Sequence, residues 1–186
     1  LYAGQYDRET ETMIAGARIR APMMQIHTVA AGGGSICRFK QGRFQIGPQS
    51  AGAIPGPACY RRGGPLTVTD CNVMLGKIQP EHFPRLFGPD GDQPIDRAAV
   101  DERFAELIAE AGTDKSPREV AEGLIAIAVA DMANAIKAVS IGAGHDPARF
   151  TLTCFGGAGG QHACLVADAL SIERVMIHPI AGVLSA

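Results

Sequence analysis

The chain has 186 residues, of which 46% are hydrophobic, so it can bury a sizeable core and is too apolar for an intrinsically disordered segment. Its 17 basic and 19 acidic residues give a formal net charge of −2, without the basic footprint of a nucleic-acid or anionic-membrane binder. No run reaches the roughly 18 apolar residues of a membrane span. We therefore expect a cytoplasmic protein with no nucleic acid and no membrane among its partners.

Cysteine and histidine usage argues against a zinc site. The five cysteines and five histidines are scattered, and no two cysteines form a C-x-x-C pair. Because zinc sites need clustered ligands, we expect reduced thiols and no metal ligated by them. The sequence opens at Leu1 instead of a methionine and stops in an apolar phrase, so we also expect a fragment of a larger chain.

The first half of the chain has the composition of strands and loops. Strand-like segments at 1–6, 12–19 and 23–30 predict an antiparallel start. Apolar residues alternate with Arg and Lys on both sides of Gln41-Gly42, which predicts a hairpin over 36–46. Residues 47–65 are dense in Gly, Pro and Ser, and a loop of that length in a compact domain usually lies over a functional site. Together with a second Gly- and Pro-rich stretch, it predicts an insertion over about 47–94.

Helix signals dominate the second half. A short helix over 72–76 is expected after Thr69 or Asp70 as its cap. A second helix should follow Asp96 and end at Gly112. A third begins at Ser116, where Pro117 and Glu119 complete a capping box. Its apolar positions nearly encircle the axis to about residue 140, so we expect a buried central helix.

The last segment predicts a βαβ unit. A strand over 150–155, a glycine turn over 156–160, a helix over 161–170 and a strand over 174–177 follow in order. A glycine turn between a strand and a helix leaves backbone N–H groups open to an anion. Gly33 and Gly34, with Gly32, can form a second anion-binding nest. Close packing, or a flexible turn, explains either set of glycines equally well.

Two polar residues stand out as candidates for chemistry. His162 falls in the first turn of the last helix, where the helix dipole lowers the pKa of an imidazole. It can serve as a neutral partner of a ligand or satisfy nearby backbone groups. Asp70, which lies between hydroxyl residues after the Gly-rich loop, suits a Mg²⁺ ligand or a general base. Capping of a helix explains Asp70 nearly as well.

Four sequence segments, in this order, resemble motifs of the hydantoinase A and 5-oxoprolinase family: residues 30–35 (AAGGGS), 47–60 (GPQSAGAIPGPACY), 67–70 (TVTD) and 155–160 (FGGAGG). The resemblance spans almost the whole chain. Within it, residues 159–164 (GGQHAC) are most similar to the 5-oxoprolinase branch, because hydantoinase and acetone carboxylase relatives more often place Pro-Leu before the histidine.

The resemblance implies an α/β fold: one ribonuclease H-like half of an actin, Hsp70 and sugar-kinase type ATPase, with a mixed sheet and packed helices. Residues 1–186 would be a single domain, the second ATPase half. ATP and Mg²⁺ are the implied cofactors, and Asp70 and His162 are the candidate catalytic residues. The implied nucleotide-binding residues are Gly33, Gly34, Gly156, Gly157, Ala158, Gly159, Gly160 and Gln161.

The implied reaction is ATP-dependent opening of the lactam of 5-oxo-L-proline to L-glutamate, a step of glutathione metabolism. The alternatives are a sibling that hydrolyses hydantoins or carboxylates ketones, and a non-catalytic nucleotide-binding or assembly module. The family's N-terminal phosphate loop would lie before Leu1, so this segment alone is expected to be inactive. The implied partners are a small-molecule substrate, the rest of the parent chain, a hydantoinase B-like domain or subunit, and further copies in a homo-oligomer.

Overall fold

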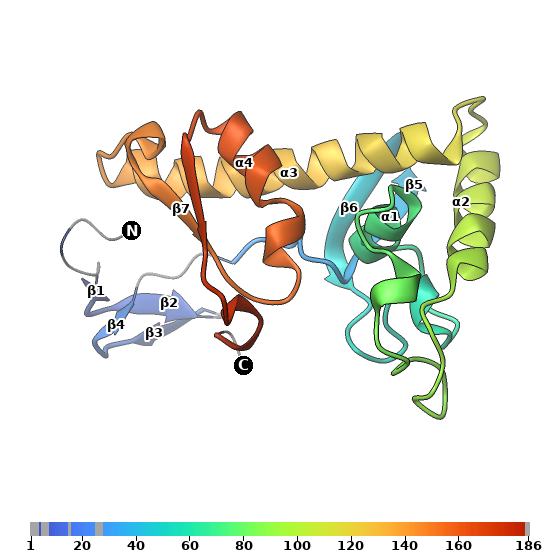
Figure 1. Cartoon of the computed structure of the whole chain (residues 1–186). Helices are drawn as coiled ribbons and strands as arrows, with labels where there is room; N and C mark the ends of the chain where they lie inside the picture. The colour runs from blue at the N-terminus through green and yellow to red at the C-terminus, as the bar shows by residue number, and fades with distance from the viewer. Residues whose placement is uncertain (1–3, 5–7, 15, 25–27, 185–186) are drawn as a thin grey trace.

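The computed structural model describes residues 4, 8–14, 16–24 and 28–184, which form a mixed α/β structure (Figure 1). Its helices are α1 (Val68–Met74), α2 (Arg97–Ala111), α3 (Pro117–Gly142) and α4 (Ala163–Ala169). Its strands pair two by two: β1 (Arg8–Glu9) with β4 (Met23–Met24), β2 (Thr12–Ile14) with β3 (Ala17–Ile19), β5 (Ser35–Lys40) with β6 (Arg43–Ser50), and β7 (Thr151–Cys154) with β8 (Arg174–Ile177). Within the described residues, the expected mixed sheet is therefore present as separate strand pairs.

The start of the chain is antiparallel, as predicted, but its strands are shorter. The expected strand over 12–19 is wrong as a single element, because the chain reverses at Gly16, whose φ is +81°. β2 and β3 are the two arms of that reversal. In the strand expected over 23–30, β4 pairs with β1, and residues 25–27 lie outside the described residues. The segment 1–6 falls largely outside the described residues.

The predicted hairpin over 36–46 is confirmed and extends further. β5 and β6 are joined by Gln41 and Gly42, whose φ angles of 55° and 74° are those of a type I′ turn. That turn matches the right-handed twist of the strands. Phe39 and Phe44 form the second residue pair from the turn, with ring centroids 5.2 Å apart in an edge-to-face arrangement.

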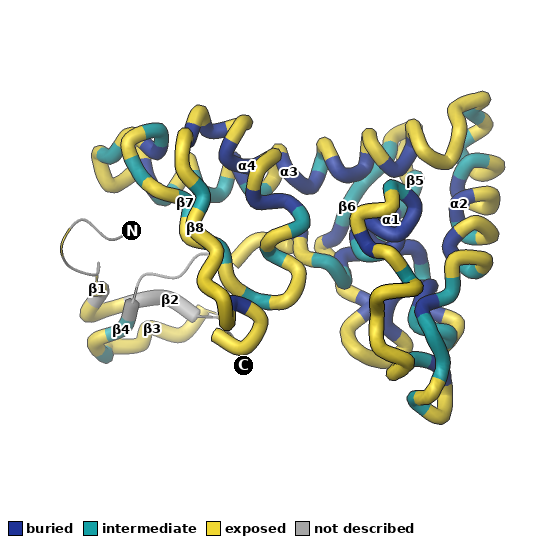
Figure 2. The backbone as a smooth tube through the Cα atoms, in the orientation of Figure 1, coloured by how far each residue is buried: buried dark blue, intermediate teal, exposed yellow. Residues whose placement is uncertain are grey.

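Helix α1 begins earlier than the sequence indicated. Thr67 is its N-cap residue, and the carboxylate of Asp70 accepts a hydrogen bond from the Thr67 N–H at 2.8 Å. The predicted start near residue 72 is therefore wrong, because Asp70 lies in the first turn of the helix instead of preceding it. The whole of α1 is buried apart from the partly buried Thr69 (Figure 2).

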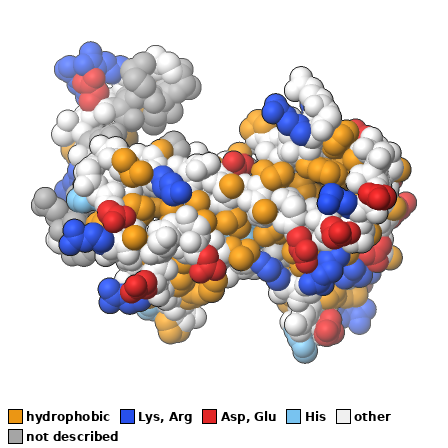
Figure 3. All heavy atoms as spheres, turned by 90° about the horizontal axis from the view of Figure 1, so that it is seen from above, with side chains coloured by type: hydrophobic (Ala, Val, Ile, Leu, Met, Phe, Trp, Pro, Cys, Tyr) orange, Lys and Arg blue, Asp and Glu red, His pale blue; other side chains and the backbone are white. Residues whose placement is uncertain are grey.

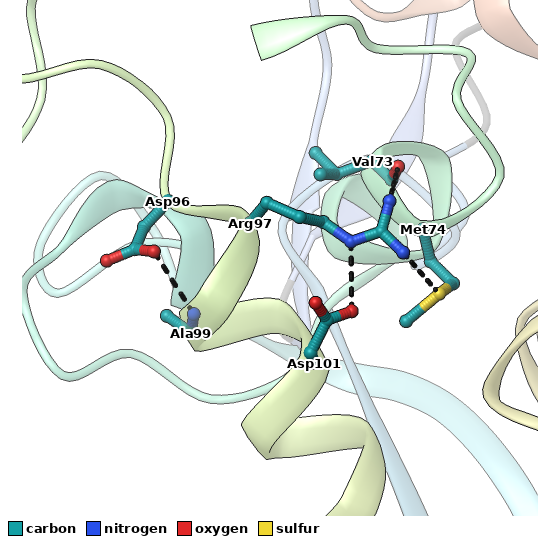
Figure 4. A network of polar contacts seen from close by, with 6 residues as sticks. All are labelled: Val73, Met74, Asp96, Arg97, Ala99 and Asp101. Atoms are coloured by element: carbon teal, nitrogen blue, oxygen red, sulfur yellow. Dashed lines mark hydrogen bonds and ion pairs between the residues drawn. The ribbon is translucent and has the colours of Figure 1, made fainter.

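Helix α2 has the predicted boundaries. The Asp96 side chain accepts a hydrogen bond from the Ala99 N–H, and Gly112 ends the helix with a φ of 60°. Arg97 then connects α2 to α1, because its guanidinium contacts the Val73 carbonyl at 3.3 Å and Asp101 at 2.9 Å (Figure 4). The beginning of α2 is thus fixed against the end of α1.

Helix α3 runs along the molecule and contacts α1, α2 and α4 (Figure 1). The predicted capping box between Ser116 and Glu119 is present. The prediction that the helix is buried holds for one side of its first half, where Leu124 is fully buried, whereas Gly123 and Ala126 on the other side are exposed. It is wrong for the end of the helix, where Ile141 is 64% exposed. Figure 3 shows the molecule from above, on the side along which α3 runs in Figure 1, and hydrophobic side chains lie exposed on this surface.

The length and apolarity of α3 would also suit a membrane span, which the search for apolar runs did not indicate. Of its most apolar window, 33% is buried in this structure. A core helix of a soluble protein meets the same two criteria, so α3 carries no membrane assignment by itself.

The C-terminal segment is the predicted βαβ unit. β7 and β8 are parallel, with Thr151 opposite Arg174 and Cys154 opposite Ile177, and α4 connects them. The hydrophobic core joins this unit to the rest of the molecule through α3, running from Phe104 of α2 to Val166 of α4. Burying a side chain such as Phe104 contributes roughly 1.5–3 kcal/mol to stability. This shared core holds the end of β7 in place relative to α1.

Candidate functional site

The glycine turn between β7 and α4 is open on its outer side. Gly156 has a φ of +87°, and its N–H donates to the Ala181 carbonyl at 2.7 Å. Among the residues that the structure describes, the amides of Gly157 and Ala158 have no protein acceptor, and both residues are exposed. A Cβ at Gly157 would meet no atom within 4 Å. The turn can therefore offer backbone N–H groups to an anion from outside.

The same turn is tightly packed on its inner side. A Cβ at Gly159 would lie 2.6 Å from the Cys154 Sγ. At that distance the Cys154 side chain would have to move to admit any residue other than glycine, so glycine fits this position by packing. Packing, one of the two explanations that the sequence left open, thus accounts for Gly159, and anion binding at Gly157 stays a prediction.

A second glycine turn, over 32–34, lies against the first. The Gly33 carbonyl accepts hydrogen bonds from the Thr69 N–H at 2.9 Å and the Thr69 hydroxyl at 3.0 Å. A Cβ on Gly33 would be 2.7 Å from that hydroxyl and 3.8 Å from the Ala158 Cβ. The structure therefore brings together two of the predicted binding segments that are far apart in the sequence.

A buried polar group joins α1 to the first glycine turn. The Asn72 side-chain Nδ2 donates to Gln161 Oε1 at 2.6 Å and lies 3.2 Å from His162 Nε2. Because an amide nitrogen can only donate, His162 Nε2 must accept, which places the proton of a neutral imidazole on Nδ1. Within the described part of the chain, His162 Nδ1 and Asn72 Oδ1 have no hydrogen-bond partner.

His162 is suited to the neutral state. It is 4% exposed, and this burial lowers its pKa from the ordinary value of 6.5. The charge of Lys77 lowers the pKa further. Lys77 also donates to the Gln161 carbonyl at 3.2 Å. His162 is thus a hydrogen-bonding group behind the turn, and its catalytic role stays a prediction.

Asp70 is fully buried beneath the Gly- and Pro-rich loop. Its carboxylate accepts four hydrogen bonds, from the N–H groups of Ala58, Cys59 and Thr67 and from the Thr67 hydroxyl, at 2.8 to 3.1 Å. Of the roles considered for Asp70, the structure shows the cap. A carboxylate whose oxygens are already occupied by four donors does not offer them to a metal ion.

The loop itself is folded by close backbone contacts. The Ala58 N–H donates to the Pro65 carbonyl at 3.1 Å, and a Cβ at Gly64 would lie 1.9 Å from the Gly56 oxygen. Arg61 forms an ion pair with Asp96 at 2.8 Å, which fixes the loop to the start of α2. The loop therefore supports α1, which in turn holds both glycine turns.

A cavity of about 450 Å³ opens behind the first glycine turn. Most of its lining is apolar and comes from α3, including Met132 and Ile136, and from β7, including Leu152. His162 and Gly159 border it on the side of the turn. Such a cavity suits an apolar group, next to a surface that suits an anion.

The described residues do not fit the expected Mg²⁺. Among them, no group of three His, Cys, Asp or Glu side chains could hold a metal ion. Asp70 is occupied, as shown above. The sequence reasoning also missed Asn72, although an asparagine inside an otherwise apolar helical segment is the kind of residue whose side chain needs a specific partner.

Comparison with known proteins gives consistent matches over the whole chain. A sequence model of the Hydantoinase_A family, described as hydantoinase/oxoprolinase, matches residues 1–186. The chain is 45% identical over 195 residues to 5-oxoprolinase 1 of Arabidopsis thaliana. That alignment covers 100% of this chain and 15% of the plant protein, so the chain spans a small part of its curated relatives.

Two solved structures share the fold. ATP-dependent caprolactamase from Pseudomonas jessenii is 35% identical, with a TM-score of 0.81 over 94% of this chain and 25% of that chain. Nucleotide-free acetone carboxylase, studied for ATP-dependent acetone carboxylation, is 25% identical, also with a TM-score of 0.81, over 96% of this chain and 25% of that chain. The expected α/β class and the predicted resemblance are confirmed. With a family model matched over residues 1–186, this chain belongs to the hydantoinase/oxoprolinase family.

Proposed function

We propose that this chain is the nucleotide-binding segment of an ATP-dependent hydrolase of cyclic amides, with 5-oxo-L-proline as the substrate. The observation that carries the proposal is the closeness of the two glycine turns, since a Cβ added to Gly33 would lie 3.8 Å from the Ala158 Cβ. Two neighbouring glycine turns, the first of them with open amides at Gly157 and Ala158, are suited to a polyphosphate. The relatives named 5-oxoprolinase and the two ATP-dependent neighbours support the same assignment.

The chemistry explains why a lactam hydrolase would need ATP. An amide carbon is a poor electrophile, and transfer of the γ-phosphoryl group to the lactam oxygen, with release of ADP, activates it. Water then adds to this carbon, the C–N bond breaks, and the ring nitrogen leaves as the protonated amine. The resulting acyl phosphate is hydrolysed by a second water to phosphate and the side-chain carboxylate of glutamate. Catalysis of the first step rests on positioning and charge stabilisation.

The residues of this chain would bind and orient the nucleotide. The open amides of Gly157 and Ala158 would contact phosphate oxygens, together with the turn that contains Gly33 and Gly34. The cavity behind Gly159 would take an apolar part of the ligand. Mg²⁺ would neutralise phosphate charge when bound, and we expect its ligands elsewhere in the parent protein.

The choice of 5-oxoproline rests on the sequence around Gln161 and His162 and on the relatives named 5-oxoprolinase. Hydantoin hydrolysis is the alternative within the same reaction class, and ketone carboxylation and a non-catalytic assembly role are the alternatives outside it. The proposal also includes a cytoplasmic parent protein that forms a homo-oligomer and works with a hydantoinase B-like domain or subunit.

The test is ATP hydrolysis by the full-length parent protein, with and without 5-oxo-L-proline, hydantoin, caprolactam or acetone with bicarbonate. Stimulation by 5-oxoproline supports the proposal, stimulation by another compound alone overturns the substrate assignment, and the absence of ATP hydrolysis overturns the enzyme assignment. The Gly157→Val variant should lose most of the activity at an unchanged melting temperature. Gly123→Val is a matched control, because a Cβ at Gly123 of α3 also meets no atom within 4 Å. Full activity of Gly157→Val would overturn the nucleotide assignment of this turn.

A further inference from the structure

Helix α1 contacts both glycine turns with residues of one face. Thr69 and Asn72 are three positions apart, so their side chains lie next to each other along the helix. Thr69 holds the Gly33 carbonyl through two hydrogen bonds. Asn72 reaches the other turn, through Gln161 and His162. The relative position of the two turns therefore depends on one short helix.

Asn72 is a polar residue at a buried position, where its side-chain amide needs hydrogen-bond partners. Its side chain is completely buried, between the apolar neighbours Cys71 and Val73. A buried amide is retained at low cost only where it is hydrogen-bonded, and here both of its N–H groups have acceptors, on Gln161 and His162. An apolar side chain would fill the same space without connecting α1 to the turn.

We propose that Asn72 is a positioning residue, whose side-chain amide holds the Gly156–Gly160 turn in register with the Gly33 turn so that both can contact one ligand. The inference rests on the proposed function for the identity of that ligand, a nucleoside triphosphate. Asn72 acts through Gln161 and His162 and does not itself contact the phosphate groups.

The first experiment measures the position of the turn without using activity. Hydrogen–deuterium exchange of the full-length protein is followed by mass spectrometry of peptides that cover residues 155–164. Asn72→Ala should speed exchange of this peptide, because the turn loses its connection to α1. Val73→Ala is the matched control, since Val73 is the next residue of the same helix, is as buried as Asn72, and within the described residues forms no hydrogen bond to the turn. Equal exchange in the two variants would overturn the inference.

The second experiment measures whether that position matters for the nucleotide. The KM for ATP should rise about tenfold in Asn72→Ala, while the KM for the lactam stays near the wild-type value, because removing one partner leaves buried groups unpaired. Gln161→Ala should have a similar effect, and the double variant should add little to it. Additive effects, or a loss of kcat at an unchanged KM for ATP, would overturn the inference.

The two experiments also separate this inference from the proposed function. If the wild-type protein neither binds nor hydrolyses ATP, the proposed function fails, and the exchange experiment still decides whether Asn72 holds the turn. If the wild-type protein is active and Asn72→Asp, which keeps the size of the side chain but removes its N–H donors, retains the wild-type KM for ATP, the positioning role fails alone.

Discussion

Asp70 lies directly beneath the backbone of Cys59, with its Oδ1 atom 2.9 Å from the Cys59 nitrogen. The other carboxylate oxygen accepts hydrogen bonds from Ala58 and Thr67. One side chain thus fixes residues 58–59 of the long loop and the start of α1 at the same time. Because α1 holds both glycine turns, this buried carboxylate supports the site from a distance.

Replacing Asp70 by asparagine should destabilise the loop. The amide has one acceptor oxygen, so its NH₂ group would face a backbone N–H donor, and we expect a cost of about 2–4 kcal/mol. Trypsin cleavage after Arg61 or Arg62 in the full-length protein should become faster, and the melting temperature should fall. Asp90→Asn, at an exposed position, is the control. Lost activity with unchanged cleavage and melting would indicate a catalytic role instead.

Gly159 and Gly157 should respond differently to alanine. A Cβ at Gly159 would collide with the Cys154 Sγ, so Gly159→Ala should lower the melting temperature of the parent protein. A Cβ at Gly157 would meet no atom within 4 Å, so Gly157→Ala should leave the melting temperature unchanged. The measurement compares the melting temperatures of the two variants and of the wild-type parent protein, all without nucleotide. Equal melting temperatures would contradict the packing described for this turn.

Local signals made the two long helices predictable. Asp96 and Gly112 bound α2, and Ser116 with Glu119 begins α3, since caps act within a few residues of the chain. The burial of α3 could not be predicted equally well. Apolar periodicity shows which side chains could be buried, but Ile141 is exposed because none of the described elements covers it.

The sequence predicted individual residues of the candidate site, but not how these residues lie relative to one another. The glycine turns at Gly33 and Gly157 were found because glycine runs are conspicuous in a sequence. Their closeness depends on where α1 places Thr69 and Asn72, and no local pattern encodes that placement. Asp70 was found for its chemistry, whereas its four donors come largely from loop backbone, which a residue pattern does not show.

The cysteines should differ in reactivity with iodoacetamide. Burial raises the pKa of the Cys59 thiol, and the charge of Asp70 raises it further. A contact with Cys37 and burial raise the pKa of Cys71. Because the thiolate is the reactive form, both should be alkylated only after unfolding, whereas the exposed Cys164 should react in the native protein. Peptide mapping by mass spectrometry measures how much of each cysteine is alkylated in the native and in the unfolded protein. Rapid labelling of Cys59 in the native protein would contradict its burial.

His162 should make the stability of the protein depend on pH below its ordinary pKa of 6.5. Burial, and secondarily Lys77, lower the pKa in the folded state. Between the lowered pKa and 6.5, the unfolded chain binds more protons than the folded one, so stability falls as the pH drops through this window. Above 6.5 both states are neutral and this contribution is constant.

The measurement compares the melting temperatures of wild type and His162→Gln in the full-length protein at about pH 7.5 and about pH 5. Wild type should lose more stability on acidification than the variant, whose side chain does not titrate. His82→Gln, at an exposed histidine, controls for the removal of any imidazole. If His162→Gln and wild type lose the same stability, the imidazole is not held neutral behind the glycine turn, and the hydrogen bond from Asn72 to its Nε2 atom does not form.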